Sequence, residues 1–308
     1  MSAPLGFAGR VVIVTGAGRG LGRSHARLLA SRGASVVVND LRGAPDVVAE
    51  ITGQGGIAVA DEHDVSQEDQ AAALVETAVT SFGGLDAVIN NAAISIDVPF
   101  TELSPEIFDR TMRVNVYGPF LVTKHAWPHL KKSGSGRVVM TISRAPVTGS
   151  PKLHSYAASK GALVGMTRQL ASEAAEYGIS VNAISPSAFT ELSRQGFASA
   201  FKRALFAKGL GVDPSDDDML LERSAAVVSA VVAWLCHADC GVNGELIQAE
   251  AGGVSRLSFA LAQGIRDPQL TIETVRDNID KILDLTDPGF PPAFLQSAPP
   301  PVSQEVRR

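Results

Sequence analysis

The sequence predicts an α/β protein with a doubly wound, Rossmann-like parallel sheet, built as a single domain with a helical extension at its C-terminus. Two observations predict this fold. Continuous apolar runs at residues 11–14 and 36–38 are typical of strands buried on both faces. These runs alternate with helix-forming stretches, as in parallel sheets with right-handed crossovers. We expect the domain at residues 1–253 and the extension at 254–308.

Composition and charge argue against several classes of protein. Hydrophobic residues make up 45% of the 308 residues and charged residues 19%, which suits a well-filled globular core. The net charge of −5 argues against nucleic acid or an anionic membrane as a partner. No stretch is expected to reach the length of a membrane span, and residues 1–10 lack the pattern of a signal peptide. We therefore expect a cytoplasmic protein that binds a small molecule.

The first strand leads into a glycine-rich turn, and a helix follows to about residue 30. Glycines at such a turn let backbone N–H groups approach a phosphate, and the helix N-terminus presents the positive end of its dipole. This arrangement predicts a dinucleotide site. The expected contacts come from Gly16, Arg19, Gly20, Leu21 and Gly22.

A second strand at residues 35–39 ends at Asp40, where dinucleotide-binding folds place the acidic residue that bonds the adenosine ribose. A carboxylate at this point repels a 2′-phosphate, so NAD is favoured over NADP. Arg19 and Arg42 are counter-evidence, because either guanidinium can meet a phosphate. The structural alternative for Asp40 is a cap of the turn that follows.

The alternation of helices and strands continues to residue 90. We expect a helix at 45–53, a strand at 57–61, a helix at 67–82 and a strand at 86–90. Polar residues follow these strands at Asp64 and at Asn90–Asn91. Because ligands bind at the carboxyl ends of parallel strands, these positions are expected to lie near the glycine-rich turn.

The strand at residues 137–142 leads into Ser143, and a helix that extends to about residue 177 carries Tyr156 and Lys160. Side chains four apart on a helix share one face. A tyrosine with a pKa of about 10 needs a drop of roughly three units to transfer protons at neutral pH. A cation about 4 Å away supplies roughly that much, so Lys160 is expected to lower the pKa of Tyr156, while Ser143 bonds the same substrate oxygen. The structural alternative is an aromatic ring packed beside a snorkelling lysine.

Asn115 lies on a helix that begins at Ser104–Pro105, and we expect Pro119 to bend this helix. The amide of Asn115 can hold a water that relays protons from Lys160 to solvent, or it can bond backbone groups at the bend.

After a strand at 180–184 and a turn at 185–190 the pattern is irregular, which predicts a lid over the substrate at about 187–218. A helix at 220–236 and a last strand at 245–248 complete the predicted sheet. Cys236 and Cys240 are expected to pack at the end of that helix, since two thiols and one histidine make a poor metal site. No metal site is predicted.

The tail contains an amphipathic helix predicted at residues 271–285, followed by a Pro- and Ser-rich arm at 288–303. An apolar stripe outside the main core must dock on its own subunit or on a partner. The stripe consists of Ile272, Val275, Ile279, Ile282 and Leu283.

Over about residues 8–253 the chain resembles the short-chain dehydrogenase/reductase family. Thr15-Gly16-x-x-x-Gly20-x-Gly22 is similar to the family's cofactor loop. Asp64-Val65 matches its adenine contact, and Asn90-Asn91-Ala92 its sheet-stabilising motif. The catalytic tetrad is matched by Asn115, Ser143, Tyr156 and Lys160.

This resemblance implies hydride transfer between a nicotinamide cofactor and an alcohol/carbonyl pair, in a homotetramer or homodimer. It also implies cofactor contacts by Asn91, Ala92, Tyr156, Lys160, Pro186 and Thr190.

Two positions depart from the family's pattern. Ala93 stands where the family usually has glycine, and its extra methyl group is expected to be tolerated. Ser187 also replaces a usual glycine, and we expect it to narrow the turn that contacts the nicotinamide.

Within the family, residues 36–41 and 234–240 resemble the (3R)-hydroxyacyl-CoA dehydrogenase unit of multifunctional enzyme type 2. We therefore expect an NAD-dependent oxidoreductase for a secondary alcohol and its ketone, with a bulky apolar substrate such as a 3-hydroxyacyl-CoA or a hydroxysteroid. The alternative is an NAD-binding regulatory or scaffold protein with little turnover. Apolar residues of the predicted lid indicate an apolar substrate: Phe189, Phe197, Phe201, Leu205 and Phe206. Its basic residues Lys202, Arg203 and Lys208 can contact the phosphates of CoA, and the alternative is that they form the solvated face of the lid.

Overall fold

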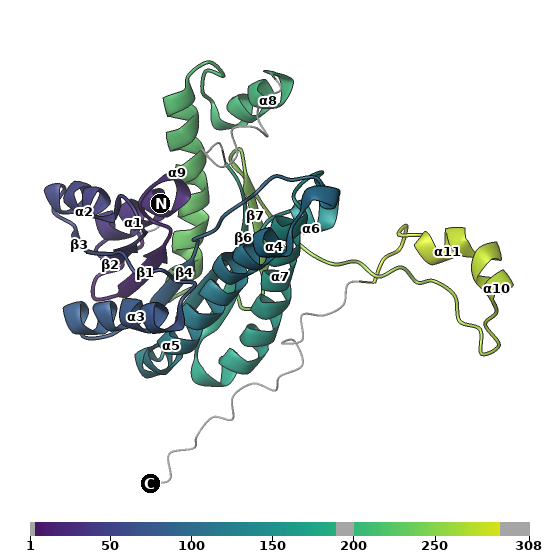
Figure 1. The fold of residues 1–308 in the computed structure, drawn as a ribbon, viewed down its shortest axis with the longest axis horizontal. Coiled ribbons are helices and arrows are strands. Elements are labelled where there is room, and N and C mark those ends of the chain that lie inside the picture. The colour runs from purple at the N-terminus through teal and green to yellow at the C-terminus, as the bar shows by residue number, and fades with distance from the viewer. Residues whose placement is uncertain (1–3, 189–199, 290–308) are drawn as a thin grey trace, which may run out of the picture.

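The computed structural model describes residues 4–188 and 200–289, and within them eight strands form one sheet (Figure 1). The strand order is β3-β2-β1-β4-β5-β6-β7-β8, in which only the β7–β8 pair is antiparallel. The order reverses between β1 and β4, the type of switch point at which ligands bind in such sheets. The predicted doubly wound sheet is confirmed.

The central strands are buried along their whole length because they consist largely of β-branched and other apolar residues. Every residue of β1, β4 and β5 is buried. The strands are β1 (Val11–Thr15), β2 (Ser35–Asn39), β3 (Ile57–Asp61), β4 (Ala87–Asn90), β5 (Arg137–Thr141), β6 (Ser180–Ser187), β7 (Leu246–Glu250) and β8 (Gly253–Leu257).

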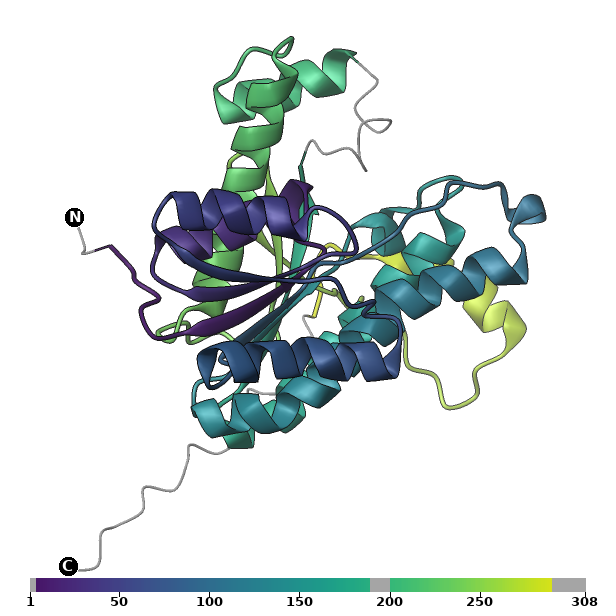
Figure 2. The same ribbon diagram turned by 60° about the vertical axis from the view of Figure 1, so that its left-hand side comes forward.

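Helices cover both faces of the sheet (Figure 2). Alternate residues of β1 point to opposite faces, so Val12 and Val14 pack with α1, α2 and α9, whereas Val11 and Ile13 pack with α3, α5 and α7. The covering helices are α1 (Gly20–Ser31), α2 (Ala44–Gly53), α3 (Glu68–Phe82), α5 (Gly118–Ser133), α7 (His154–Ala174) and α9 (Asp217–Cys236). The remaining helices are η1 (Phe100–Glu102), α4 (Pro105–Met112), η2 (Arg113–Tyr117), α6 (Ala145–Thr148), η3 (Ala175–Tyr177), α8 (Ala200–Leu210), α10 (Ile272–Asp277) and α11 (Ile279–Leu283).

Helix α9 corrects the expectation that no stretch reaches the length of a membrane span. Among the described residues it is the one helix that is long and apolar enough, with 20 residues and a mean hydropathy of 1.6 over its most apolar window. It packs against α1 and against β5, β6 and β7, where Val228, Val232 and Leu235 are buried. Its apolar composition is therefore explained by burial in the core of the domain.

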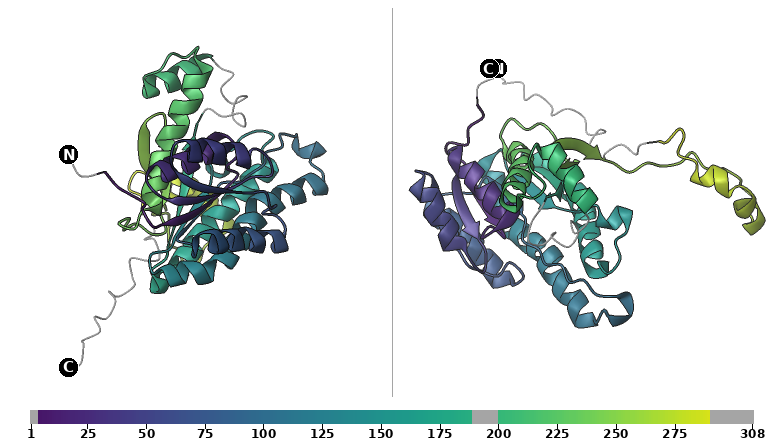
Figure 3. Two further views of the ribbon diagram at one scale, coloured as in Figure 1. Left: turned by 90° about the vertical axis from the view of Figure 1, so that its left-hand side faces the viewer. Right: turned by 90° about the horizontal axis from the view of Figure 1, so that it is seen from above.

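Two predictions for the C-terminal part were wrong. The strand predicted to be last is followed by β8, because Ala251 and Gly252 adopt left-handed backbone angles (φ 46° and 85°) that form a tight hairpin. The single helix predicted at 271–285 is two short helices that meet at Asn278, whose side chain donates to the carbonyl of Thr274. Asparagine competes with helical bonds in this way. Figures 1 and 3 show this segment projecting from the body of the protein.

Candidate active site

The glycine-rich turn connects β1 to α1 and is closely packed against the end of β4. A Cβ at Gly16 would lie 2.7 Å from Ala92 Cα, and a Cβ at Gly22 would lie 2.2 Å from the carbonyl oxygen of Gly16. Arg19, at the N-cap of α1, makes no side-chain capping bond. The N–H groups of the first turn of α1 therefore receive no cap from that side chain, which suits a site for a phosphate.

Thr15 and Asn91 hold the end of β4 against this turn. The Thr15 hydroxyl accepts the N–H groups of Asn91 and Ala92 at 3.0 and 3.1 Å. In return, Asn91 Nδ2 donates to the carbonyls of Thr15 and Gly16, both at 3.0 Å. The sheet-stabilising role expected for Asn91 is confirmed, and cofactor contact by Asn91 and Ala92 stays a prediction.

The Asp40 carboxylate lies beside the same turn. Its Oδ2 accepts the N–H of Gly18 at 3.0 Å, and its Oδ1 accepts the N–H of Arg42 at 3.2 Å. Asp40 therefore caps the turn after β2, as the structural alternative expected, and it borders the predicted dinucleotide site as well. Arg42 and Arg19, which follows Gly18 in the chain, are both exposed.

Asp64 and Val65 follow β3 at the same edge of the sheet. Asp64 Oδ1 accepts the N–H of Ser66 at 2.9 Å, and the N–H of Asp64 donates to Gln70 Oε1 at 2.8 Å. Val65 is buried, and its Cγ2 would lie 3.0 Å from a Cβ at Gly118. These contacts hold the loop in place, and its contact with an adenine stays a prediction.

Ser143, just after β5, and Tyr156, in the first turn of α7, come together as predicted. The Ser143 hydroxyl lies close enough to the Tyr156 phenol to act on its pKa. The hydroxyl oxygen of Ser143 also accepts the N–H of Ala145 at 3.2 Å, which holds the serine in place at the start of α6. Lys160 Nζ lies 5.7 Å from the centroid of the Tyr156 ring, on the same face of α7.

The expected lowering of the Tyr156 pKa by Lys160 is not found. Burial raises the pKa of Tyr156 above its ordinary value, and the nearby Ser143 hydroxyl acts in the opposite direction. Burial also lowers the pKa of Lys160 to about 7. The ammonium group donates to the neutral carbonyl of Thr141 at 2.7 Å. Removal from water disfavours the charged form of each group, so the lysine carries only part of its charge near neutral pH.

Asn115 lies in a π-helical turn, η2, between α4 and α5. The helix is therefore interrupted before Pro119, which stands in the first turn of α5, and not bent by that proline. Asn115 Oδ1 accepts the N–H of Ile94 at 2.8 Å, and its Nδ2 donates to the carbonyl of Ile94 at 2.9 Å and to Ser159 Oγ at 3.0 Å. Its backbone-bonding role is confirmed, and the proton relay stays a prediction.

The family model for short chain dehydrogenases matches residues 10–198. The chain belongs to the short-chain dehydrogenase/reductase family. It is an oxidoreductase, and relatives in this family carry names of dehydrogenases. Another relative is peroxisomal multifunctional enzyme type 2 of Mus musculus, which is 37% identical over 312 residues that cover 96% of this chain and 40% of the mouse enzyme. The chain therefore spans less than half the length of that relative.

Solved structures of the short-chain dehydrogenase/reductase family have the same fold. A short chain dehydrogenase from Mycobacterium avium matches with a TM-score of 0.74 and 37% identity over 89% of this chain and 96% of the other. A 7α-hydroxysteroid dehydrogenase complexed with NADH and 7-oxo glycochenodeoxycholic acid matches with a TM-score of 0.70 and 28% identity. That match covers 80% of this chain and 95% of the other.

Ser187, where the family usually has glycine, belongs to a polar cluster that the sequence did not reveal. Its hydroxyl donates to Glu250 Oε1 at 3.1 Å. Arg144, next to Ser143, forms an ion pair with Glu250 Oε2 at 3.1 Å, and Gln248 Nε2 donates to the same oxygen at 2.9 Å. The cluster joins the ends of β5, β6 and β7. In the sequence, the serine at position 187 was the one sign of this cluster, because Arg144 and Glu250 lie far from Ser187 along the chain.

The predicted lid is partly outside the described residues, which exclude Phe189, Thr190 and Phe197. The described part is more regular than expected, because it contains α8 and the start of α9. Phe206 is buried with Leu220. The Arg203 guanidinium bonds the Asp217 carboxylate. A role for this segment as a lid stays a prediction, as do the cofactor contacts of Pro186 and Thr190.

Cys236 and Cys240 are both buried and carry free thiols. Burial raises the pKa of the Cys236 thiol to about 12, so the thiol is protonated at neutral pH. The predicted packing role is confirmed. Within residues 4–188 and 200–289, no three His, Cys, Asp or Glu side chains are grouped so as to hold a metal ion.

Proposed function

We propose that the protein is an NAD-dependent oxidoreductase that interconverts a secondary alcohol and a ketone by hydride transfer. The observation that carries the proposal is the proximity of Ser143 to Tyr156, with Lys160 on the same face of α7. A phenol, a hydroxyl and a lysine in this arrangement can exchange a proton with a substrate oxygen. A protein that only binds a dinucleotide does not need them, which weighs against a regulatory or scaffold role.

The residues around the glycine-rich turn fit a dinucleotide. Gly16 and Gly22 leave no room for a side chain, so the backbone of the turn can approach a phosphate closely. The Asp40 carboxylate at the end of β2 supports binding of an unphosphorylated adenosine ribose, and therefore of NAD over NADP. When bound there, the nicotinamide would accept or supply the hydride.

Tyr156 exchanges the proton in this mechanism. In the oxidation direction its phenolate takes the proton of the substrate hydroxyl, while Ser143 bonds the same substrate oxygen. The Ser143 hydroxyl opposes the effect of burial on the pKa of Tyr156 and so favours the ionised form. Lys160 has a pKa of about 7, so it can gain or lose a proton near neutral pH and transfer the proton from Tyr156 toward solvent. Asn115 bonds both the carbonyl of Ile94 and the hydroxyl of Ser159. It thereby positions the groups along which a proton would pass from Lys160 to solvent.

The substitution Tyr156→Phe tests this mechanism. We expect turnover of secondary alcohols to fall about 1,000-fold, because the ring remains and the proton-transfer group is lost. NADH binding, followed by fluorescence, should stay within a factor of about two, since the phenol is only one of many contacts. Tyr177→Phe is the matched control, because Tyr177 lies outside the site and packs against Lys131. Near-normal turnover by the Tyr156 variant would contradict the mechanism.

For the substrate, we propose a bulky apolar secondary alcohol such as a 3-hydroxyacyl-CoA or a hydroxysteroid. The names of two relatives support this class: one is a peroxisomal multifunctional enzyme and the other is a hydroxysteroid dehydrogenase. The ion pair of Arg203 with Asp217 weakens the case for CoA phosphate contacts on α8. Initial rates with 3-hydroxyacyl-CoA thioesters and with free hydroxysteroids distinguish the two, and activity on short alcohols alone would exclude both.

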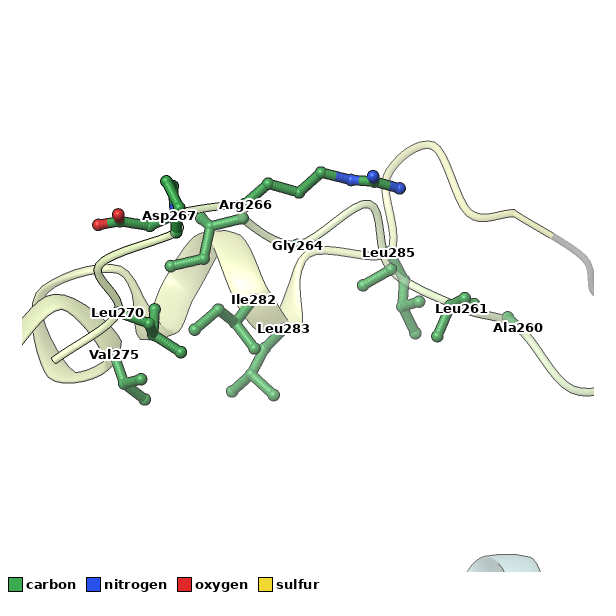
Figure 4. Close-up of a pocket in the computed structure, with 13 residues that line it drawn as sticks. Ala260, Leu261, Gly264, Arg266, Asp267, Leu270, Val275, Ile282, Leu283 and Leu285 are labelled. Carbon is green, nitrogen blue, oxygen red and sulfur yellow. The ribbon is translucent and has the colours of Figure 1, made fainter. Parts of the chain in front are cut away.

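We also propose a homo-oligomer, a tetramer or a dimer, as the working form. Figure 4 shows Leu270, Val275, Ile282 and Leu283 on one side of the C-terminal segment, with Arg266 and Asp267 on the other. These apolar side chains line an open hollow, and Ile272 and Leu283 are 85% and 68% exposed. Exposed apolar surface of this kind marks a protein contact. A cytoplasmic location and the absence of nucleic-acid or membrane partners stay predictions, which cell fractionation tests.

A further inference from the structure

We propose that Gly18 is a positioning residue for cofactor specificity, because it lets the glycine-rich turn hold the Asp40 carboxylate where it selects NAD over NADP. Gly18 lies between Gly16 and Gly20 of the cofactor loop, and its contacts are with the loop after β2. The inference rests on the proposed use of NAD, and it assigns the cause of that preference to a backbone contact.

The turn and the loop after β2 approach each other more closely than side chains allow. A Cβ at Gly18 would lie 2.0 Å from the carbonyl oxygen of Arg42 and 3.1 Å from the Cβ of Asp40. Gly43 faces it from the other side, where a Cβ would lie 3.1 Å from the carbonyl oxygen of Gly18. Because the severe contact is with backbone, no change of side-chain rotamer relieves it. A side chain at position 18 must push the two segments apart.

This close approach holds the Asp40 carboxylate from two sides. Gly18 N–H donates to Oδ2 at 3.0 Å, and Arg42 N–H donates to Oδ1 at 3.2 Å. The N–H of Ala17 continues the contact by donating to the carbonyl of Asn39 at 2.8 Å. Each carboxylate oxygen accepts one bond from the backbone and keeps capacity for a second, which suits the two hydroxyls of a ribose.

The position of the Asp40 carboxylate matters because two guanidinium groups of the same region can attract the 2′-phosphate that the carboxylate repels. Arg19 and Arg42 are exposed, and a guanidinium binds a phosphate well. A fixed carboxylate opposes a 2′-phosphate by like charge, whereas a displaced carboxylate leaves the two guanidinium groups free to attract it. Separation of the two segments is therefore expected to reduce the discrimination between the two cofactors as well as the affinity for NADH.

The test is a fluorescence titration of NADH and NADPH with the full chain and with Gly18→Ala. We expect the Kd for NADH to rise about tenfold, the effect of a lost hydrogen bond to a charged group. We expect the ratio of the NADPH Kd to the NADH Kd to fall by about the same factor, which a general loss of structure does not produce. Gly53→Ala is the matched control, since a Cβ at Gly53 meets no atom within 4 Å. Both of its Kd values should equal those of the wild type.

If Gly18→Ala does not fold, Asp40→Asn in the natural Gly18 background replaces it. The amide then places an N–H₂ group opposite one of the two backbone N–H groups, and the cofactor ratio should fall in the same way. If the wild type prefers NADH and the variant has the same ratio of the NADPH Kd to the NADH Kd, the role of Gly18 is contradicted and the proposed use of NAD is not. A wild-type protein that binds neither cofactor, or that prefers NADPH, would instead overturn the proposed use of NAD.

Discussion

At the scale of single residues, burial changes the pKa values of ionisable side chains in a way that the sequence does not reveal. His25 on α1 is buried against α9, where its Nδ1 lies 2.7 Å from Ser229 Oγ. Its Nε2 has no hydrogen-bond partner among the described residues. Burial lowers the pKa of His25 to about 3, so the ring is neutral at neutral pH. The same effect lowers the pKa of Lys160 to about 7. It explains why the effect of Lys160 on the pKa of Tyr156 was predicted wrongly from the sequence.

We predict that His25→Gln reduces the acid sensitivity of the fold. The folded pKa lies below the ordinary 6.5, so between pH 6.5 and about 3 the unfolded chain binds more protons. The stability due to this group is present above pH 6.5 and is lost as the pH falls, by up to about 1.4 kcal/mol per pH unit. Urea unfolding at pH 7 and pH 5 measures this. The variant should lose less stability between the two values than the wild type, and an equal loss would contradict the assignment.

At the scale of elements, buried polar side chains fix where helices and strands end. Arg137 in β5 is buried and donates to the carbonyls of His237 at 3.1 Å and Ala238 at 2.6 Å, just past the end of α9. It also donates to its neighbour Gly136 at 2.9 Å. Backbone carbonyls at a helix C-terminus lack intrahelical partners, and a cation satisfies them well. Arg137 thus ties α9 to the sheet.

We predict that Arg137→Met destabilises the domain by about 3 kcal/mol, because the methionine fills the space but leaves buried carbonyls unpaired. The free energy of unfolding in urea measures the loss. Arg168→Met, a change on α7 that breaks no hydrogen bond or ion pair among residues 4–188 and 200–289, serves as a control and should cost less than about 0.5 kcal/mol. A loss below about 1 kcal/mol for Arg137→Met would show that water can replace the arginine.

The cluster around Glu250 joins the ends of three strands beside Ser143, and it explains the presence of a serine at position 187. Because the Ser187 hydroxyl bonds Glu250, we predict that Ser187→Gly leaves NADH affinity within a factor of about two. Fluorescence titration measures this affinity, and Gly53→Ala gives the scatter expected of a harmless change. A gain of tenfold or more in the glycine variant would mean that the serine narrows the cofactor site, as the sequence suggested, and would favour the scaffold reading.

At the scale of the whole molecule, the compact sheet domain contrasts with the projecting C-terminal segment. The body buries two large apolar clusters, one on each face of the sheet, and a small one around Phe206 and Leu220. The segment from α10 to α11 has helices of six and five residues, too short to be stable alone in water. Its apolar stripe remains exposed in the single chain except at Ile282, which is half-buried. Such a segment is expected to gain its stability from a contact with another subunit.

We predict that the double variant Ile272→Ser, Leu283→Ser has a weaker subunit association than the wild type. Burial of each side chain is worth about 2 kcal/mol, so the pair should raise the dissociation constant about 1,000-fold. Light scattering after size-exclusion chromatography measures the mass as a function of concentration. Ile57→Ser on β3, an exposed isoleucine of the body, is the control. A monomeric wild type, or an unchanged mass in the double variant, would contradict the proposal.

The sequence by itself determined the sheet, the glycine-rich turn and the choice of Ser143, Tyr156 and Lys160 as the candidate site. Apolar runs such as β1 and local spacings such as Tyr156 to Lys160 are short-range patterns, and short-range geometry follows from residue type. Only the tertiary structure decided the pKa of Tyr156, the Glu250 cluster and the contact of Gly18 with Arg42. Each depends on burial or on backbone segments that approach from distant parts of the chain, and neither distance nor removal from water is encoded in local periodicity.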